Sequence, residues 1–551
     1  MAKKILKIIG FTALTILIAL IALVVYVRIV AAVDAPSVGS SPVEHMERLE
    51  TSQGSYALGK SWFRKSESGL YEMYVEGNPY SIGLASGKLA KELVQYQEVA
   101  FTNQIRQLVP SEMYLSVLKY FVGWFNRDLE QHIPEEYKQE IYGISQVASH
   151  EFDDIAPPYQ RILNYHAAHD IGHALQNMSL VGCTSFATWG NKSEDSTLII
   201  GRNFDFYVGD DFARDKIIAL YRPEKGHAFM MITFGGMTGV LSGMNEQGLT
   251  VTINAAKSEV PTASATPVSL VAREILQYAS TIDEAYAIAK KRKMFVAESF
   301  LIGSAKDRRA AIIEKTPEEI DLVEATEEYL VCTNHFQGKV VGNTPLNTEH
   351  KRTSASVYRH QRVNELLNNN GKNTVANTAS ILRNQLGLQN ADIGLGNEKS
   401  INQLIAHHGI IFQPEKKLVW VSTTPWQLGK FVCYDLSKVF QSTLPVSEIY
   451  EQDQTLPADS FLLTKNYSRY LKFAPFRFPF QSREGLQPDS LVAQNPNSYL
   501  SYMLAGDVYL TAHQFEKART AYEIGLTKEI ATLQERDHMV TNLARCKKEI
   551  K

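Results

Sequence analysis

The sequence is poor in cysteine and lacks the close cysteine pairs of zinc-binding proteins. Its 551 residues include four cysteines, Cys183, Cys332, Cys433 and Cys546, and no two of them form a CxxC pair. This pattern excludes a small disulfide-rich scaffold and offers no cysteine-based zinc site. A single disulfide stays open as an alternative if the chain lies in an oxidising compartment. We do not expect Cys183 to take part in it.

The sequence also lacks a strong excess of charge of either sign. Its formal net charge is −3, and 21% of its residues are charged. Nucleic-acid-binding proteins usually carry a basic excess or patch, so we expect no nucleic-acid partner. The hydrophobic content of 44% is high enough to build packed cores, which excludes a globally disordered chain. The length predicts about two to four structural units.

Long hydrophobic runs are absent except for one at the N-terminus. Residues Ile8 to Val27 carry no charge and follow Lys3, Lys4 and Lys7. About 20 apolar residues are enough to span a bilayer, which favours an uncleaved anchor. The stretch VAAVDA offers a cleavage site, so a cleavable signal peptide is the alternative. The lysines favour a cytoplasmic N-terminus, which predicts a single-pass protein with its remainder on the extracytoplasmic (periplasmic or extracellular) side.

Changes in periodicity divide the chain into five predicted parts. Helical spacing dominates from Ser55 to about Leu180, whereas short strands bounded by turn residues begin at Cys183 and alternate with helical stretches. Strands, helices and strands again predict an α+β sandwich. The parts are an anchor or signal segment at 1–34, a linker and helical segment at 35–182, an α+β block at 183–445, a linker at 446–490 and a helical tail at 491–551.

The tail resembles a single tetratricopeptide repeat. Tyr502, Gly506, Tyr509, Ala518 and Tyr522 match the aromatic and small positions of that repeat. Such repeats need neighbours to cover their apolar faces. Two interpretations therefore stay open: a helical hairpin that packs on the α+β block, and a docking site for a protein partner.

Cys183 follows a glycine at the start of a strand-like run, in the sequence VGCTSFATWG. A cysteine acts as a nucleophile when a base or a lowered pKa supplies its thiolate. No papain-like motif surrounds Cys183. If the chain were cut before this residue, its own α-amine, with a pKa of ~7.7–8.0, would be a nearby base. Gly182 suits such a cut because a glycine leaves room for attack on its carbonyl.

Several motifs give the block a recognisable family resemblance. The stretches GCTSF, GRNFDF, GMNEQGLTVTINAA, CTNHF and, more weakly, SASVYRHQR follow one another between Cys183 and about Leu436. In these motifs the chain resembles the N-terminal nucleophile hydrolases, in the branch of choloylglycine hydrolases, N-acylethanolamine acid amidases and penicillin-type acyltransferases. The resemblance implies a four-layer αββα sandwich, self-cleavage between Gly182 and Cys183, and chemistry without a cofactor.

The resemblance also implies roles for charged residues in the motifs. Cys183 would be both the cleavage residue and the nucleophile. Arg202 matches the family arginine beside the nucleophile, where a guanidinium favours a thiolate. Asp205 matches the carboxylate that holds the new α-amine. Without the resemblance, an ion pair at a strand end would be the preferred interpretation of Arg202 and Asp205.

Polar residues from later motifs complete the implied site. Asn254 matches the asparagine that donates to the oxyanion, and Asn334 matches a second active-site asparagine. The assignment of an active-site arginine to Arg359 depends on the weakest motif, SASVYRHQR, and Arg362 is the alternative. His335 is interpreted as a residue that supports or faces the site, because the α-amine acts as the base in this family.

Three histidines precede the nucleophile in NYHAAHDIGH. His166, His169 and His173 fall near one helical face and have a spacing that could hold a metal. No carboxylate partner is evident, so helix packing near the cut is the favoured interpretation and no metal is expected.

Together these features predict a membrane-anchored, self-processing amidase or acyltransferase. Its expected substrate is a small non-peptide N-acyl amide, such as a bile-salt-like, N-acyl lipid or acyl-amino compound, cleaved through a thioester acyl-enzyme. One alternative is a catalytically inactive membrane scaffold that docks a protein through the tail. Another is a cysteine peptidase in which a histidine such as His335 acts as the base.

Overall fold

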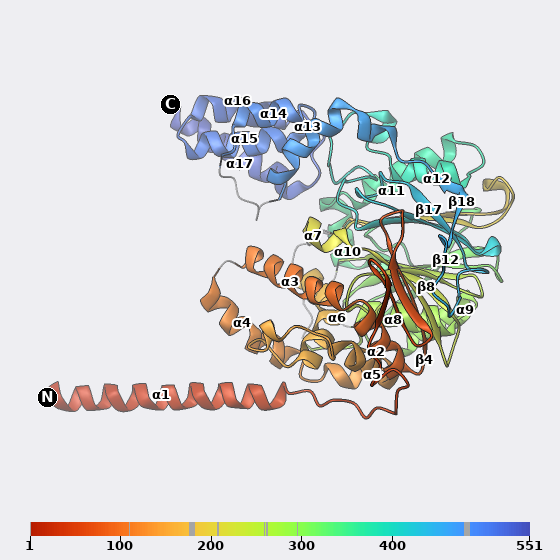
Figure 1. Cartoon of the computed structure of the whole chain (residues 1–551). Coiled ribbons are helices and arrows are strands. Elements are labelled where there is room, and N and C mark those ends of the chain that lie inside the picture. The colour runs from red at the N-terminus through yellow and green to blue at the C-terminus, as the bar shows by residue number, and fades with distance from the viewer. Residues whose placement is uncertain are drawn as a thin grey trace.

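The computed structural model describes residues 2–109, 111–175, 182–206, 209–257, 259, 263–294, 296–478 and 485–550. Figure 1 shows the whole chain, with α1 leading away from a layered body and the last helices gathered at one end. The helices are α1 (Ala2–Val30), α2 (Pro79–Leu89), α3 (Lys91–Leu108), α4 (Glu112–Phe125), α5 (Glu135–Ser145), α6 (Pro158–Leu175), α7 (Asp210–Arg214), α8 (Val268–Tyr278), α9 (Ile282–Lys291), α10 (Pro345–Thr353), α11 (Ser356–Asn369), α12 (Val375–Leu382), α13 (Lys465–Phe473), α14 (Pro488–Gln494), α15 (Tyr499–Thr511), α16 (Phe515–Gly525) and α17 (Leu533–Glu549).

Two large sheets form the body. The first has eleven strands in the order β1 (Leu49–Ser52), β2 (Ser55–Leu58), β3 (Ser61–Lys65), β4 (Tyr71–Gly77), β7 (Ile217–Pro223), β8 (Phe229–Thr233), β9 (Ser242–Asn245), β10 (Leu249–Ala255), β11 (Glu298–Ser304), β12 (Arg309–Lys315) and β13 (Ile320–Glu324). The second has seven in the order β14 (Tyr329–Cys332), β5 (Thr184–Thr188), β6 (Ile199–Phe204), β15 (His408–Gln413), β16 (Leu418–Ser422), β17 (Phe431–Asp435) and β18 (Tyr450–Leu456).

The apolar cores show how these sheets and helices pack. One core joins side chains of both sheets, for example Leu220 and Met230 of the larger sheet with Ile200 and Val421 of the smaller. A second core packs α2, α5, α8 and α9 against the larger sheet, and a third packs α11 and α12 against the smaller. Burying an apolar face on each layer is the main driving force for such stacking. The mixed α+β class expected from the sequence is confirmed.

The N-terminal part departs from the expected helical segment. Residues 49–77 form the strands β1 to β4, and β4 pairs in parallel with β7, so that Met73 lies opposite Ala219. The expectation of mostly helical structure from Ser55 is therefore wrong up to Gly77, and α2 begins at Pro79. The error has a physical cause, because β4 is buried on both faces and lacks the alternating pattern that marks a half-buried strand.

The expected linker at 446–490 also contains regular structure. It includes β18, which extends the smaller sheet, together with α13 and the start of α14. Helices α13 and α14 share an apolar core with the block, in which Leu404 and Leu428 contact Tyr470 and Phe473. The segment is thus part of the folded body.

The tail is a set of packed helices that contacts the block. A Cβ on Gly506 of α15 would lie 2.5 Å from the Tyr522 ring of α16, so only glycine allows this close helix approach. Lys399 forms an ion pair with Glu529 at 2.5 Å, and Asn397 Nδ2 donates to the Glu529 carbonyl. The hairpin-packing interpretation agrees with these contacts, while the resemblance to a tetratricopeptide repeat stays a prediction.

Helix α1 is long and apolar enough to cross a membrane. Its stretch Lys3–Val30 reaches a mean hydropathy of 2.9, and no part of the most apolar window is buried. A signal sequence near an N-terminus meets the same criteria of length and composition.

Candidate active site

Cys183 lies directly before β5 and is 1% exposed. Strand β5 runs between β14 and β6, which places Ser185 opposite both Arg202 and Cys332. The Gly182 N–H donates to the Asp205 carbonyl at 2.8 Å and so continues the β5–β6 pairing beyond the strand ends. This pairing holds the Gly182–Cys183 peptide bond next to Asp205.

The carbonyl oxygen of Gly182 accepts hydrogen bonds from two side chains. Arg359 Nη1 donates to it at 2.8 Å and Gln403 Nε2 at 2.7 Å. A Cβ on Gly182 would collide with the Gln403 amide, so any larger residue there would displace this donor. Two donors on one carbonyl oxygen are the arrangement that stabilises negative charge as that carbon is attacked.

Arg202 places its guanidinium beside the nucleophile. Its Nη2 lies 3.8 Å from Cys183 Sγ and also donates to the Ile253 carbonyl. Its Nη1 contacts Ser242 and His408. Burial raises the pKa of the Cys183 thiol to about 11, and the positive charge of Arg202 opposes that rise. The uncleaved site therefore holds a neutral thiol at pH 7.

Asp205 presents a buried carboxylate with no hydrogen-bond partner among the residues that the structure describes. Burial raises its pKa to about 7, while the charges of Arg359, Arg477 and Arg202 act in the opposite direction. Most buried polar groups are paired, so an unpaired carboxylate beside the Gly182–Cys183 bond calls for an explanation.

One of the two predicted asparagines lies on a strand, and the other lies in the segment after a strand. Asn254, in β10, accepts from Ser185 Oγ at 2.6 Å and donates to the Cys332 carbonyl at 3.2 Å. Asn334, directly after β14, donates to the Ala255 carbonyl and accepts from Arg359 Nη2 at 2.7 Å. Both amides are thus fixed within one hydrogen-bonded network.

The structure distinguishes between the two arginines of α11. Besides Gly182, Arg359 donates to the Cys183 carbonyl at 2.6 Å and to Thr184 Oγ1 at 2.9 Å. Arg362 instead binds Asn384, Asn390 and Glu365, away from the nucleophile. Arg359 is therefore the α11 arginine that contacts the Gly182–Cys183 segment.

His335 is engaged with neighbouring hydroxyls. Its Nδ1 lies 2.8 Å from Ser356 Oγ and 3.1 Å from Thr333 Oγ1. Ser356 Oγ also accepts from the Asn334 N–H, so His335 supports the position of Asn334. Burial lowers the pKa of His335 to about 3, which leaves the ring neutral at pH 7.

Three groups near the site carry no motif that sequence reasoning could detect. Gln403 precedes β15 by a few residues and reaches Gly182 from 221 positions away. Arg477, from the segment expected to be a linker, donates to the Gln403 carbonyl at 2.5 Å. Glu298, at the start of β11, is fully buried, and neither of its carboxylate oxygens has a hydrogen-bond partner in the described part of the chain. Burial and the nearby Asp170 raise the pKa of Glu298 well above its usual value.

The histidines before the nucleophile are only partly described. His166 Nδ1 lies 2.8 Å from the Ile162 carbonyl and its Nε2 accepts from the Thr238 N–H, so both ring nitrogens are used in packing. The side chains of His169 and His173 lie outside the described residues. Within the described ranges no group of three or more His, Cys, Asp or Glu side chains could hold a metal. All four cysteines are free thiols.

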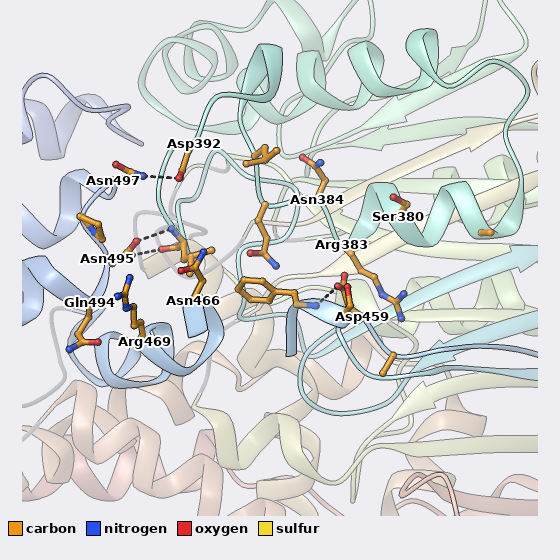
Figure 2. A pocket seen from close by; sticks show the side chains of 18 residues that line it. Ser380, Arg383, Asn384, Asp392, Asp459, Asn466, Arg469, Gln494, Asn495 and Asn497 are labelled. Carbon is orange, nitrogen blue, oxygen red and sulfur yellow. Dashed lines mark hydrogen bonds between the residues drawn. The ribbon is translucent and has the colours of Figure 1, made fainter. Parts of the chain in front are cut away.

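A cavity of about 860 Å³ lies away from this cluster. Figure 2 shows it between the loop after α12 and the segment from α13 to α14, with amide and charged side chains such as Asn384, Asn466 and Arg469 along its wall. Cys183 does not line it, so this cavity is separate from the candidate active site.

Comparisons with known proteins agree with the resemblance. Residues 191–421 match the sequence model of the acyl-coenzyme A:6-aminopenicillanic acid acyl-transferase family. An uncharacterized protein of Archaeoglobus fulgidus is 24% identical over 264 residues, covering 45% of this chain and 44% of that protein. Protein dcd1B of Dictyostelium discoideum is 22% identical over 261 residues, covering 44% of this chain and 49% of that protein. The matched region thus spans about half the length of these curated relatives.

Two solved structures are also similar to part of this chain. One is an N-acylethanolamine-hydrolyzing acid amidase ortholog of Caenorhabditis elegans, with 16% identity, 42% of this chain and 93% of that chain covered, and a TM-score of 0.30. The other is the C2A mutant of conjugated bile acid hydrolase from Clostridium perfringens, with 12% identity, 49% and 96% covered, and a TM-score of 0.30.

The motifs of the α+β block and the match of residues 191–421 to this family model together support a relationship to the N-terminal nucleophile hydrolases. The matched model is that of an acyl-transferase family, which agrees with the expected enzyme class, an amidase or the related acyltransferase.

Proposed function

We propose that the chain is a membrane-anchored, self-processing cysteine amidase or acyltransferase that acts on a small N-acyl amide. Its body would be the four-layer αββα sandwich of N-terminal nucleophile hydrolases, and α1 would be the anchor. The observation that carries this proposal is the Gly182–Cys183 peptide, whose carbonyl oxygen accepts from Arg359 and Gln403 while the Cys183 thiol lies beside Arg202.

Self-cleavage would start with attack of Cys183 Sγ on the Gly182 carbonyl carbon. The carbon–nitrogen bond between the two residues breaks, and the nitrogen takes up the thiol proton to become the α-amine of Cys183. The acyl group is left as a thioester on Sγ, which water hydrolyses to a Gly182 carboxylate and a free thiol. Arg359 and Gln403 would stabilise the negative charge on the Gly182 oxygen during the attack.

The buried Asp205 would act after this cut. Its backbone carbonyl accepts from the Gly182 N–H, and its carboxylate has no hydrogen-bond partner among the described residues and is near enough to Cys183 for its charge to raise the pKa of the thiol. A new ammonium or amine there would give the carboxylate its missing partner and would lower its pKa. Held in this way, the α-amine would take the thiol proton when Cys183 attacks a substrate carbonyl.

The same groups would then process the substrate amide. Attack by Cys183 Sγ breaks the substrate carbon–nitrogen bond, the leaving amine takes the proton from the α-amine, and the acyl group becomes a thioester. Water gives hydrolysis, and a second amine gives acyl transfer. Asn254 and Asn334 are the proposed amide donors to the substrate oxyanion.

The first test compares the wild-type chain with Cys183→Ala by intact mass and N-terminal sequencing. We expect a fragment that begins with Cys183 in the wild type and a single uncut chain in the variant. Fragments in both samples would assign the cut to another agent. An uncut wild type that still hydrolyses N-acyl amides would refute the self-processing mechanism.

The substrate class and the anchor have separate tests. A panel of N-acyl lipids, bile-salt conjugates and acyl-amino acids, with hydroxylamine as an added acceptor, distinguishes hydrolysis from acyl transfer. Washing membranes in plain buffer and then in denaturant tests the anchor, since a spanning helix resists both washes. After a cut before Cys183, the N-terminal fragment with α1 would have to hold the catalytic fragment at the membrane without a covalent bond. Release of the catalytic fragment in plain buffer would show that it is not held there.

A further inference from the structure

Helix α4 exposes an apolar face to its surroundings. Met113, Val117 and Phe121 recur every four residues, which places them along one side of the helix, and they are 81%, 64% and 52% exposed. Tyr114 and Trp124 are exposed as well. We call these five residues the α4 face. A helix on a water-facing surface normally turns charged and polar residues outward, so this helix has the opposite arrangement.

The exposed face belongs to a helix that is attached to the body on its other side. Phe125, at the end of α4, is buried, and the following Asn126 donates to Asn164 of α6 at 3.0 Å. Lys119 reaches the Asp154 carbonyl at 2.9 Å. These contacts fix which side of α4 faces the protein and which side faces away from it.

Helix α4 also contacts the end of α1. Arg28 Nη2 donates to Tyr120 OH at 3.1 Å, and its guanidinium lies 5.7 Å from the centre of that ring. A Cβ on Gly123 would lie 3.1 Å from Ala31 Cβ, so the two segments touch closely. In Figure 1, α4 lies on the side of the body from which α1 leads away. The exposed apolar face is therefore next to the place where the apolar helix meets the body.

We propose that the α4 face lies in the interfacial layer of the bilayer that α1 crosses and docks the body on the membrane surface. This inference rests on the anchor role given to α1 in the proposed function. With 14 residues, α4 is too short to span the membrane and has the length of an interfacial segment. Its aromatic residues Tyr114 and Trp124 are of the types enriched at the membrane–water boundary.

Basic side chains around α4 fit the same location. Arg28, Lys119 and Arg127 lie at the edge of the apolar face, and Arg127 is 4.4 Å from the centre of the Trp124 ring. Long basic side chains at such a boundary reach the lipid headgroups while their stems stay in apolar surroundings. Anionic headgroups would add an electrostatic attraction.

The test measures lipid contact in the full-length chain reconstituted into vesicles of phosphatidylcholine and phosphatidylglycerol. Val117→Cys is labelled with an environment-sensitive fluorophore, and the matched control carries the label at Val446→Cys, a fully exposed position just before β18. The four native cysteines are buried, and a parent sample shows the background labelling. We expect nitroxide lipids to quench the label at 117 strongly and the label at 446 weakly.

Each outcome of this test decides the proposal. Equal, weak quenching at both positions in vesicle-bound protein would overturn the docking face and leave the anchor intact. A blue-shifted label at 117 without lipid quenching would mean that protein rather than lipid covers the α4 face, and it would also overturn the proposal. Protein that fails to remain with the vesicles would refute the anchor itself. In a second variant pair, Phe121→Asp should reduce the quenching of a label at Met113→Cys.

Discussion

Replacing Arg359 by alanine should slow self-cleavage of the chain far more than replacing its neighbour Arg362. Both arginines lie on α11 and are buried, and both carry several hydrogen bonds. Only Arg359 donates to the carbonyl oxygen of Gly182, at 2.8 Å, where negative charge would develop during the attack by Cys183. The pair therefore separates a loss of charge stabilisation from a general loss of packing.

The magnitude follows from the number of donors. Removing one donor to a developing oxyanion typically slows a reaction by about 10²–10³-fold, or about 2.7–4 kcal/mol. Gln403 Nε2 remains as the second donor in Arg359→Ala, so we expect a value near the lower end, about 100-fold. Arg362→Ala should leave the cleavage rate within about threefold of wild type, because Arg362 makes no hydrogen bond to the Gly182–Cys183 segment and its loss changes only contacts away from the cut.

The assay follows the uncut chain and its two fragments by intact mass after cell-free synthesis into lipid nanodiscs. Both substitutions are also made in the uncleavable Cys183→Ala chain, and thermal unfolding then compares their costs in stability. Cleavage of Arg359→Ala at the wild-type rate would refute the reasoning. If Arg362→Ala slowed cleavage as much as Arg359→Ala and lost as much thermal stability, the slowing would be a consequence of weaker folding.

Three further predictions concern the buried groups around the cut. In the Cys183→Ala chain, Glu298→Gln should raise the melting temperature more at pH 8 than at pH 5. The pKa of Glu298 is higher in the folded chain than in the unfolded chain. The folded state therefore loses stability as the pH rises from the unfolded pKa toward the folded pKa, and glutamine removes this loss. An equal gain at both pH values would show that its charge is not the cause. Gly182→Ala should displace the Gln403 amide and slow self-cleavage by about 100-fold, the lower end of the effect of losing one donor. Adding Gln403→Ala should cost little more, because both changes remove the same donor. Additive slowing in the rate assay would contradict this. His335→Ala should keep measurable amidase activity with an unchanged pH profile, since the ring is neutral and bonded to Ser356; loss of one limb of the profile would make His335 the base.

Much of the fold class and of the candidate site can be predicted from short motifs. GCTSF and GRNFDF fall on neighbouring strands, β5 and β6, so local sequence already places Cys183 near Arg202. Strand β4 could not be predicted, because its pairing partner β7 lies far along the chain and the consecutive buried residues at its centre hide the alternating pattern of a strand.

The sequence by itself determined the nucleophile candidate, the glycine before it, the apolar N-terminal run and the family that the block resembles. Only the tertiary structure decided which α11 arginine reaches Gly182, and it added Gln403 and Glu298 to the candidate site. The physical reason is that motifs record neighbours along the chain. Arg359 and Gln403 lie 177 and 221 positions from Gly182 along the chain, so their hydrogen bonds to it depend on how the two sheets and their helices pack.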